Sequence, residues 1–389
     1  MKRLVGVLLL ASALPSLCRT LSDPDQDAEC SDMSSRLRGF VPWKHCNTTT
    51  LKKKQLEQIQ APTTTLYLPL IYLLAFSVGL PTNLLALWVL VFRTKHMPST
   101  TLLINLTVVD CLLFLVLPFR IVYHFRGNDW FLGETSCRIV MAMFYGNMYS
   151  SVWCLALVAL DRYVALVHPF GAKSFRSRRV SLYMSVWVWV VQLAAMLPLL
   201  LSQQTYQLDD PKITTCHDVL PESEQQKFLL PYFSTLFVFC FLLPFVVVLF
   251  CHSAILHTLL AERRRYSHAI RVTVLVIVVF IACLLPSNLL LLLTYSNAWP
   301  DAQDLYVPYT ISLAVSTFNS CIDPFIFYFV SKEFRQKVKS VLCCVSESED
   351  GPSSKGSTPS SAGQKSNITL LSMTPDTAAR SQQDDVKET

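Results

Sequence analysis

Ionisable residues interrupt three long stretches of apolar sequence. Asp110 and Asp323 each stand within such a stretch, and Asp161-Arg162-Tyr163 closes another. Charged side chains are costly inside a bilayer and mark functional sites by default. Ser151 lies midway along its stretch, so it could join Asn319-Ser320 and the two lone aspartates around a small cation such as sodium. The alternative is a water-filled polar cluster with a protonated aspartate, and the sequence leaves both open.

Enzyme chemistry has no comparable support. The H-E-x-x-H, G-x-S-x-G and P-loop motifs are absent from the sequence, and the eight histidines show no metal-site spacing. We therefore expect neither an enzyme nor a cofactor, apart from the candidate sodium ion.

The elements that carry these residues are predicted to be membrane spans. The chain is 52% hydrophobic and 15% charged, whereas soluble domains are about 25% charged. Seven stretches have the roughly 20 apolar residues that a transmembrane helix needs. We expect an all-α membrane protein, a seven-transmembrane helix bundle over 66–330. Its spans are predicted at 66–92, 100–123, 138–166, 181–201, 230–257, 269–295 and 305–330.

The distribution of basic residues predicts the orientation. Loops after the first, third and fifth spans carry ten Lys or Arg, counting Arg271 at the start of the sixth span, against three in the alternate loops. Basic loops stay in the cytoplasm. The N-terminus is therefore predicted outside and the C-terminus inside, in the plasma membrane. Residues 1–18 resemble a secretory signal peptide, with an N-terminal anchor as the alternative.

The remaining segments flank the bundle. Residues 19–65 are expected to be extracellular, 331–344 to contain a short amphipathic helix on the inner leaflet, and 345–389 to form a disordered cytoplasmic tail. Cys343 and Cys344 are palmitoylation candidates, with two reduced thiols as the alternative.

Cysteines on the outer side suggest disulfides. Cys137 begins the third span and Cys216 lies in the second outer loop, and a bridge would pin that loop over the bundle mouth. Cys30 and Cys46 are the remaining pair, and three outcomes stay open for them: a second bridge, two free thiols or a link between two copies of the chain. Asn47-Thr-Thr is an outward glycosylation sequon.

Several motifs occur in an order that resembles the rhodopsin-type G-protein-coupled receptors over about residues 66–344. They are Asn83, Asn105-x₄-Asp110, Asp161-Arg-Tyr, Phe280-x-x-Cys283-x-x-Pro286 and Asp323-Pro324. The resemblance implies that Asp161-Arg162-Tyr163 is the switch that contacts heterotrimeric G proteins. Arg162 is expected to hold the inner face closed through Asp161.

Longer stretches resemble the protease-activated (thrombin-type) receptors. They are 144–149, 216–220, 286–288 and 320–325, and the stretches 256–259, 264–268 and 289–295 are similar to the fourth subtype. The wider family has Asn-Pro-x-x-Tyr where this chain has Asp323-Pro-Phe-Ile-Phe327. Tyr328 follows and is turned by about 100° around a helix, which puts a tyrosine-mediated, water-bridged active state in doubt.

In that family a serine protease cuts the outer N-terminus and exposes a ligand tethered to its own receptor. Cleavage after Arg38 would expose Gly39-Phe40-Val41-Pro42-Trp43-Lys44, and Arg38 supplies the long cation that trypsin-like pockets need. Arg36 is the competing site. Leu37 and the basic run 52–54 favour a trypsin-like protease over thrombin.

The tether makes a weak ligand sufficient. About 27 residues separate Gly39 from the first span, giving a flexible chain a reach of about 30 Å and a local concentration near millimolar. Asp218 is our first choice to bind the new ammonium, with Glu222 and Glu224 behind it. The family resemblance implies that three tyrosines line the pocket, unless they form interfacial belts: Tyr145, Tyr295 and Tyr309.

The expected partners follow from this hypothesis. They are the activating protease, G proteins acting through phospholipase C and calcium, arrestin bound to a phosphorylated tail, membrane lipids and a homo- or hetero-dimer partner, without nucleic acid. A receptor for a diffusible peptide would keep the bundle but would not depend on Arg38. A transporter or channel would usually show repeats, and the sequence has none.

Overall fold

A computed structural model of the chain describes residues 43–45, 48–51, 53–94, 97–168, 176–220, 225–261, 266–295 and 305–342. The chain divides into two units, and every described residue belongs to the second, Ser35–Thr389. Seven of its helical segments are long and apolar enough to cross a membrane, which confirms the predicted fold class.

The helices match the predicted spans with small differences at their ends. They are α3 (Leu68–Phe92), α4 (Pro98–Phe125), α5 (Glu134–Val167), α7 (Arg178–Leu201), the fifth span, α11 (Ser267–Tyr295) and α12 (Tyr306–Val330). The fifth span consists of η2 (Gln225–Leu229), α9 (Leu230–Leu236), η3 (Phe237–Leu242) and α10 (Leu243–Ala261). Prolines lie inside several of these helices. Neighbouring helices can satisfy the carbonyls that these prolines free.

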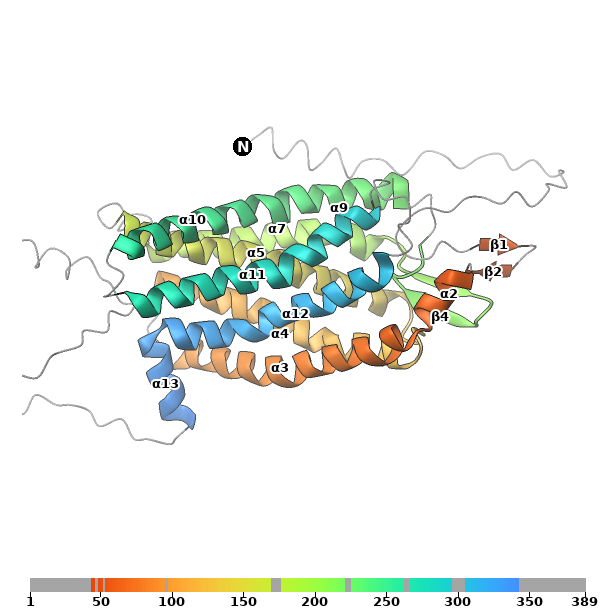
Figure 1. Cartoon of the computed structure of the whole chain (residues 1–389), viewed down its shortest axis with the longest axis horizontal. Coiled ribbons are helices and arrows are strands. Elements are labelled where there is room, and N and C mark those ends of the chain that lie inside the picture. The colour runs from red at the N-terminus through yellow and green to blue at the C-terminus, as the bar shows by residue number, and fades with distance from the viewer. Residues whose placement is uncertain are drawn as a thin grey trace, which may run out of the picture. The chain divides into compact units, whose positions relative to one another are not determined.

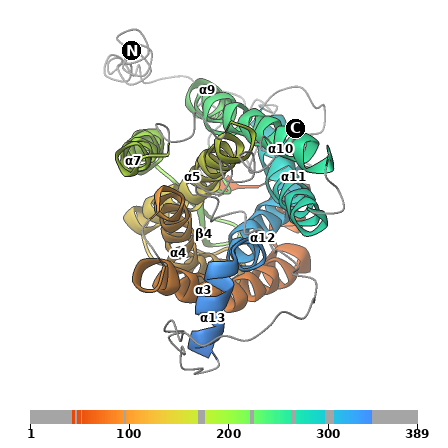
Figure 2. The same ribbon diagram turned by 90° about the vertical axis from the view of Figure 1, so that its left-hand side faces the viewer.

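Six of the helices form a closed ring. In the view along the bundle, α3, α4, α5, α10, α11 and α12 follow one another, and α7 lies outside against α4 and α5 (Figure 2). Aromatic side chains fill the interior, among them Phe114, Tyr149, Phe241 and Phe280. Exposed large apolar residues such as Leu74, Leu182 and Phe250 cover the outer faces, which is typical of helices in contact with lipid.

The two ends of the bundle carry different elements. At one end lie the hairpin β3–β4 (Thr205–Leu208 and Ile213–Cys216), the hairpin β1–β2 (Trp43–His45 and Thr48–Thr50) and the helix α2 (Lys53–Ile59) (Figure 1). We call this the disulfide end. The opposite end carries Arg162 and the helix α13 (Lys332–Leu342), and we call it the arginine end.

The structure corrects one expectation about the first span. The chain from Gly39 to that span is expected to be flexible, yet α2 and the π-helical turn η1 (Thr63–Tyr67) occupy residues 53–59 and 63–67. The reason is burial, because Leu51 and Ile59 are 4% and 0% exposed. The spacing of Leu56 and Ile59, three residues apart, is compatible with one helical face, but a short helix cannot be inferred without its partner surface.

The amphipathic helix after the last span is confirmed as α13. Ser331 caps it, since its Oγ accepts a hydrogen bond from the Phe334 N–H at 3.1 Å. Phe334 and Val338 are buried, and the Phe334 ring packs edge-on against Phe327 at 6.2 Å. Lys332 and Lys339 are exposed on the other side.

Helices α3 and α4 approach closely at Gly79, which yields a prediction about stability. A Cβ atom there would lie 2.1 Å from Phe114 Cζ, and the Phe114 ring is fully buried. At Gly146 the corresponding contact is the end of the half-buried Gln192 side chain at 2.9 Å, which can rotate away. Gly79→Ala should therefore cost about 1–3 kcal/mol of stability and lower the melting temperature by about 3–10 °C. Gly146→Ala is the matched control and should change the melting temperature by less than about 2 °C. Equal shifts for the two variants would show that the contact with Phe114 does not determine the cost of the added methyl group.

Candidate functional site

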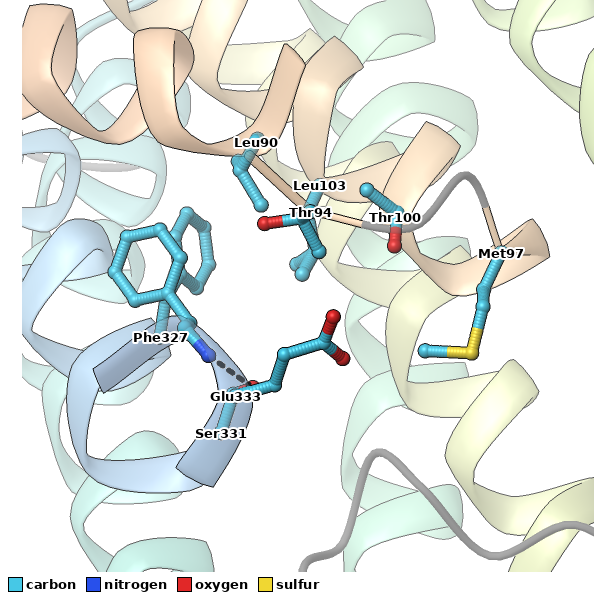
Figure 3. A pocket seen from close by; sticks show the side chains of 9 residues that line it. Leu90, Thr94, Met97, Thr100, Leu103, Phe327, Ser331 and Glu333 are labelled. Carbon is cyan, nitrogen blue, oxygen red and sulfur yellow. Dashed lines mark hydrogen bonds between the residues drawn. The ribbon is translucent and has the colours of Figure 1, made fainter. Parts of the chain in front are cut away.

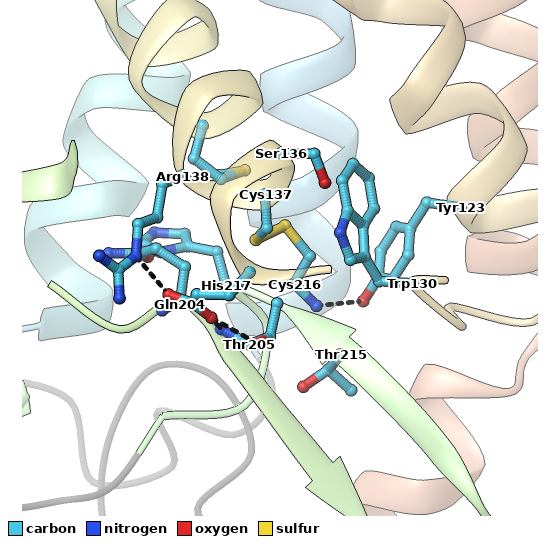
Figure 4. The surroundings of a disulfide bond; sticks show 12 residues. Tyr123, Trp130, Ser136, Cys137, Arg138, Gln204, Thr205, Thr215, Cys216 and His217 are labelled. Atoms are coloured by element: carbon cyan, nitrogen blue, oxygen red, sulfur yellow. Dashed lines mark hydrogen bonds and ion pairs between the residues drawn. A yellow bond between two sulfur atoms is a disulfide. The ribbon is translucent and has the colours of Figure 1, made fainter. Parts of the chain in front are cut away.

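The disulfide end is organised by one covalent bond. Cys137, in the first turn of α5, is linked to Cys216 at the end of β4, with their Cα atoms 5.9 Å apart (Figure 4). This confirms the predicted bridge. It fixes the end of the β3–β4 hairpin to the first turn of α5.

Two carboxylates that the sequence analysis missed secure the same loop. Glu134 accepts hydrogen bonds from the backbone N–H groups of Gln204 and Thr205, both at 2.8 Å, and from Arg138 Nε at 2.5 Å. Asp129 accepts from the Thr214 N–H at 3.0 Å. Both residues lie within eight positions of Cys137 in the sequence, and this proximity is the only signal that could have found them.

The last residue of β4 and the four residues that follow it form a buried segment, Cys216–Leu220. Each of them is at most 6% exposed. His217 has a positive φ of 67°, and its Nδ1 donates to Gln204 Oε1 at 2.5 Å. Its ring contacts that of Tyr145 at 5.4 Å. The loop therefore points inward and closes this end of the bundle.

Asp218, the first-choice ammonium partner, lies within this segment. Its Oδ2 accepts a hydrogen bond from the Tyr123 hydroxyl at 2.6 Å. The carboxylate is turned into the bundle, so an incoming ammonium must displace or join Tyr123. Glu222 and Glu224 lie outside the described residues.

The structure brings together two of the three tyrosines implied by the resemblance. The hydroxyls of Tyr145 on α5 and Tyr309 on α12 are hydrogen bonded at 2.8 Å, and both residues are at most 1% exposed. Tyr145 also packs against Phe233 on α9, with ring centroids 5.2 Å apart. The side chain of Tyr295, at the end of α11, lies outside the described residues.

A buried cation lies beside this cluster and was not predicted. Arg120 on α4 is 2% exposed, and its guanidinium carbon lies 5.7 Å from the ring centroids of both Tyr123 and Phe144. It forms no ion pair within 4.0 Å with any described residue. Cation–π contacts with these rings and the electrostatic attraction of Asp218 offset the cost of burying its charge.

Halfway along the bundle, the residues proposed to surround a cation do meet. Asp110 Oδ1 lies 3.4 Å from Ser151 Oγ, and the carboxylates of Asp110 and Asp323 are close enough to interact electrostatically. Their Oδ2 atoms and Asn319 Nδ2 are buried and have no hydrogen-bond partner among the described residues. Buried polar atoms normally have partners, so this cluster fits a cation or ordered water.

Asn147 belongs to the same cluster and was overlooked. Its Nδ2 lies 3.2 Å from Asp110 Oδ1, 3.3 Å from Ser151 Oγ and 3.4 Å from Ser320 Oγ. The signal was available, because Asn147 precedes Ser151 by four residues and so lies on the same face of α5.

At the arginine end, the structure corrects the expected role of Asp161. Its Oδ1 accepts a hydrogen bond from Arg176 Nε at 3.0 Å. The carboxylate therefore pairs with Arg176, and it attracts Arg162 electrostatically without an ion pair within 4.0 Å between the two. Arg162 instead lines a cavity of about 20 Å³ with His252 and Thr273, which is room for about one water. Tyr163 contacts His168, with Oη and Nε2 2.9 Å apart. The sequence distance of 15 residues between Asp161 and Arg176 gave no hint of their pairing.

A smaller cavity of about 10 Å³ lies between α3, α4, α12 and α13. Figure 3 shows Phe327 on one side of it and Thr94 and Thr100 opposite, with the Glu333 side chain extending between them. Phe327 is 3% exposed and fills the position where the wider family has tyrosine, while Tyr328 is only half-buried.

Several predicted sites lie outside the described residues. They are Arg38, Gly39, Phe40, Val41, Pro42, Cys30, Cys46, Asn47, Cys343 and Cys344. The backbone of Trp43 and Lys44 is described, in β1.

Comparison with known proteins places this arrangement in a class. The sequence profile described as "7 transmembrane receptor (rhodopsin family)" matches residues 82–327, which is more than half of the chain.

Individual relatives are more specific. Human proteinase-activated receptor 4 is 49% identical over 275 residues, covering 70% of this chain and 71% of the relative. Rat proteinase-activated receptor 4 is 46% identical over 311 residues, covering 79% and 78%. Human proteinase-activated receptor 3 is 39% identical over 284 residues, covering 72% and 76%. The chain therefore belongs to the proteinase-activated receptors, which are multi-pass G-protein-coupled receptors and not enzymes.

Proposed function

We propose that cleavage after Arg38 activates this receptor and that the new N-terminus, Gly39–Lys44, is its tethered agonist. The proposal rests on the position of the C-terminal end of this segment in the structure. Trp43–His45 pair antiparallel with Thr48–Thr50, and β2 runs next to β3 of the loop that closes the disulfide end. The ligand sequence thus ends beside the site that it would enter.

The site is chemically suited to such a ligand. A free α-amino group is largely protonated near neutral pH. Asp218 offers a carboxylate whose hydrogen-bond partner, Tyr123, is neutral, and which the buried Arg120 attracts electrostatically without an ion pair within 4.0 Å. A charge-assisted bond from the ammonium is stronger than the bond from the hydroxyl. Before cleavage Gly39 has an amide in place of the ammonium and therefore cannot compete for Asp218.

Binding would break the closed arrangement at Tyr145. Phe40 and Trp43 supply aromatic area, and the rings that now fill the space are those of Tyr145, His217 and Phe233. Entry of the ligand must separate them and with them the Tyr145–Tyr309 contact between α5 and α12.

The orientation and partners belong to the same proposal. The disulfide end faces outward and the arginine end faces the cytoplasm, where Arg162 meets a heterotrimeric G protein that acts through phospholipase C and calcium. A trypsin-like protease or thrombin cuts the N-terminus, and arrestin binds the phosphorylated tail. The signal peptide 1–18, the glycan at Asn47, palmitoylation at Cys343 and Cys344, lipid contact of α13 and dimerisation remain expectations.

We also propose that sodium binds between α4 and α12. Asp110, Ser151 and Asp323 would hold it, with Asn319 adjacent, because hard cations prefer oxygen ligands. The bound ion would neutralise the repulsion of two buried carboxylates and so favour the closed bundle.

The cleavage proposal is tested at Arg38. Arg38→Ala should lose protease-triggered calcium release, because a trypsin-like pocket has no cation to bind, while the free peptide Gly-Phe-Val-Pro-Trp-Lys still activates. Arg36→Ala is the control and should respond as the wild type does. A full protease response of Arg38→Ala, or its loss in Arg36→Ala, would refute cleavage after Arg38 and favour the other site or a diffusible ligand.

The sodium proposal is tested by melting the purified receptor in NaCl and in KCl of equal ionic strength. At tenfold excess over its dissociation constant, sodium should add about 1.4 kcal/mol of stability, raising the melting temperature of the wild type by about 3–5 °C. Asp110→Asn should melt at the same temperature in both salts. Equal melting temperatures for the wild type would mean that the cluster holds water.

A further inference from the structure

The segment before the first span is docked onto the disulfide end. Leu51 and Ile59 pack with Leu208 of β3, Val219 of the buried segment and Tyr306 of α12 in one apolar cluster. All five side chains are at most 5% exposed. A seven-residue helix such as α2 does not persist alone in water, so its presence depends on this contact.

Hydrogen bonds fix the end of α2 in place. Asn128 Nδ2 donates to the Ile59 carbonyl at 2.5 Å, and Asn128 Oδ1 accepts from His124 Nδ1 at 2.6 Å. Asn128 is fully buried and has a positive φ of 65°, a conformation that asparagine tolerates. Thr64 Oγ1 donates to the same carbonyl at 2.9 Å.

We propose that Leu51–Ile59 is the anchor of the tether, so that the ligand swings from Leu51 and not from the start of the first span. This inference rests on the proposed cleavage after Arg38. About 12 residues then separate Gly39 from its fixed point instead of about 27. Once β1 leaves β2 so that Trp43 and Lys44 can enter the site, the r.m.s. reach of a chain without structure falls from about 30 Å to roughly 20 Å.

The consequence is a higher local ligand concentration. Because this concentration falls as about the −3/2 power of linker length, the shorter tether raises it about threefold. The anchor also contacts Val219, which is the neighbour of Asp218. The pivot therefore lies next to the proposed ammonium partner.

The test compares Ile59→Asp with Gln60→Asp. Both add one carboxylate to adjacent positions, but Ile59 is buried and Gln60 is exposed, so only the first should undock α2. Both are placed in a Val41→Ala background, which weakens the tethered ligand and keeps occupancy below saturation. G-protein nucleotide exchange is measured in membranes after protease treatment and, separately, with free Gly-Phe-Val-Pro-Trp-Lys peptide.

Ile59→Asp should lower the protease response about threefold relative to the peptide response, and Gln60→Asp should leave the ratio unchanged. Equal ratios in the two variants would overturn the anchor. If Ile59→Asp fails to reach the surface or to respond to peptide, Leu51→Asp takes its place in the same comparison. Arg38→Ala is assayed in parallel. If Arg38→Ala does not respond to protease and the ratios of protease response to peptide response are equal in Ile59→Asp and Gln60→Asp, only the anchor is refuted. If Arg38→Ala responds to protease, the cleavage proposal itself is refuted.

Discussion

The Cys137–Cys216 disulfide is the constraint on which the described disulfide end depends. It holds the end of β4 against α5, and only from there can the next four residues turn inward and become buried. Asp218 reaches the Tyr123 hydroxyl, His217 reaches Tyr145, and Val219 reaches α2 because this one point is fixed. Closing a loop of this length also removes conformational entropy from the unfolded chain, which stabilises the folded form.

Helix α5 connects the three clusters of polar residues. It carries Cys137 and Tyr145 near the disulfide end, Asn147 and Ser151 in the middle, and Arg162 at the other end. A ligand that displaces Tyr145 from Tyr309 acts on the same helix that lines the cation cluster and the Arg162 cavity. A displacement of this one helix at the disulfide end would therefore act on the packing at all three clusters, as helix shifts do in switching proteins.

Much of this fold follows from the sequence. Apolar stretches of sufficient length predicted all seven spans because a bilayer allows few other structures, and the topology placed Cys137 and Cys216 on one side. The predictions failed where a contact joins residues through space without a periodic pattern. Asp161 pairs with Arg176, 15 residues further along the chain. Glu134 binds backbone groups some 70 residues away, and α2 is helical only because Leu208, Val219 and Tyr306 offer it a surface.

The proposed activation depends on one exchange, in which Asp218 gives up its hydrogen bond with Tyr123 and binds the ammonium of Gly39. The most direct measurement is the potency of the free peptide Gly-Phe-Val-Pro-Trp-Lys against its N-acetylated form, on wild type, Asp218→Asn and Tyr123→Phe receptors. The wild type should prefer the free amine by about tenfold or more, equivalent to about 1.4 kcal/mol. Tyr123→Phe should retain that preference, and Asp218→Asn should lose it. An undiminished preference for the free amine in Asp218→Asn would contradict the account.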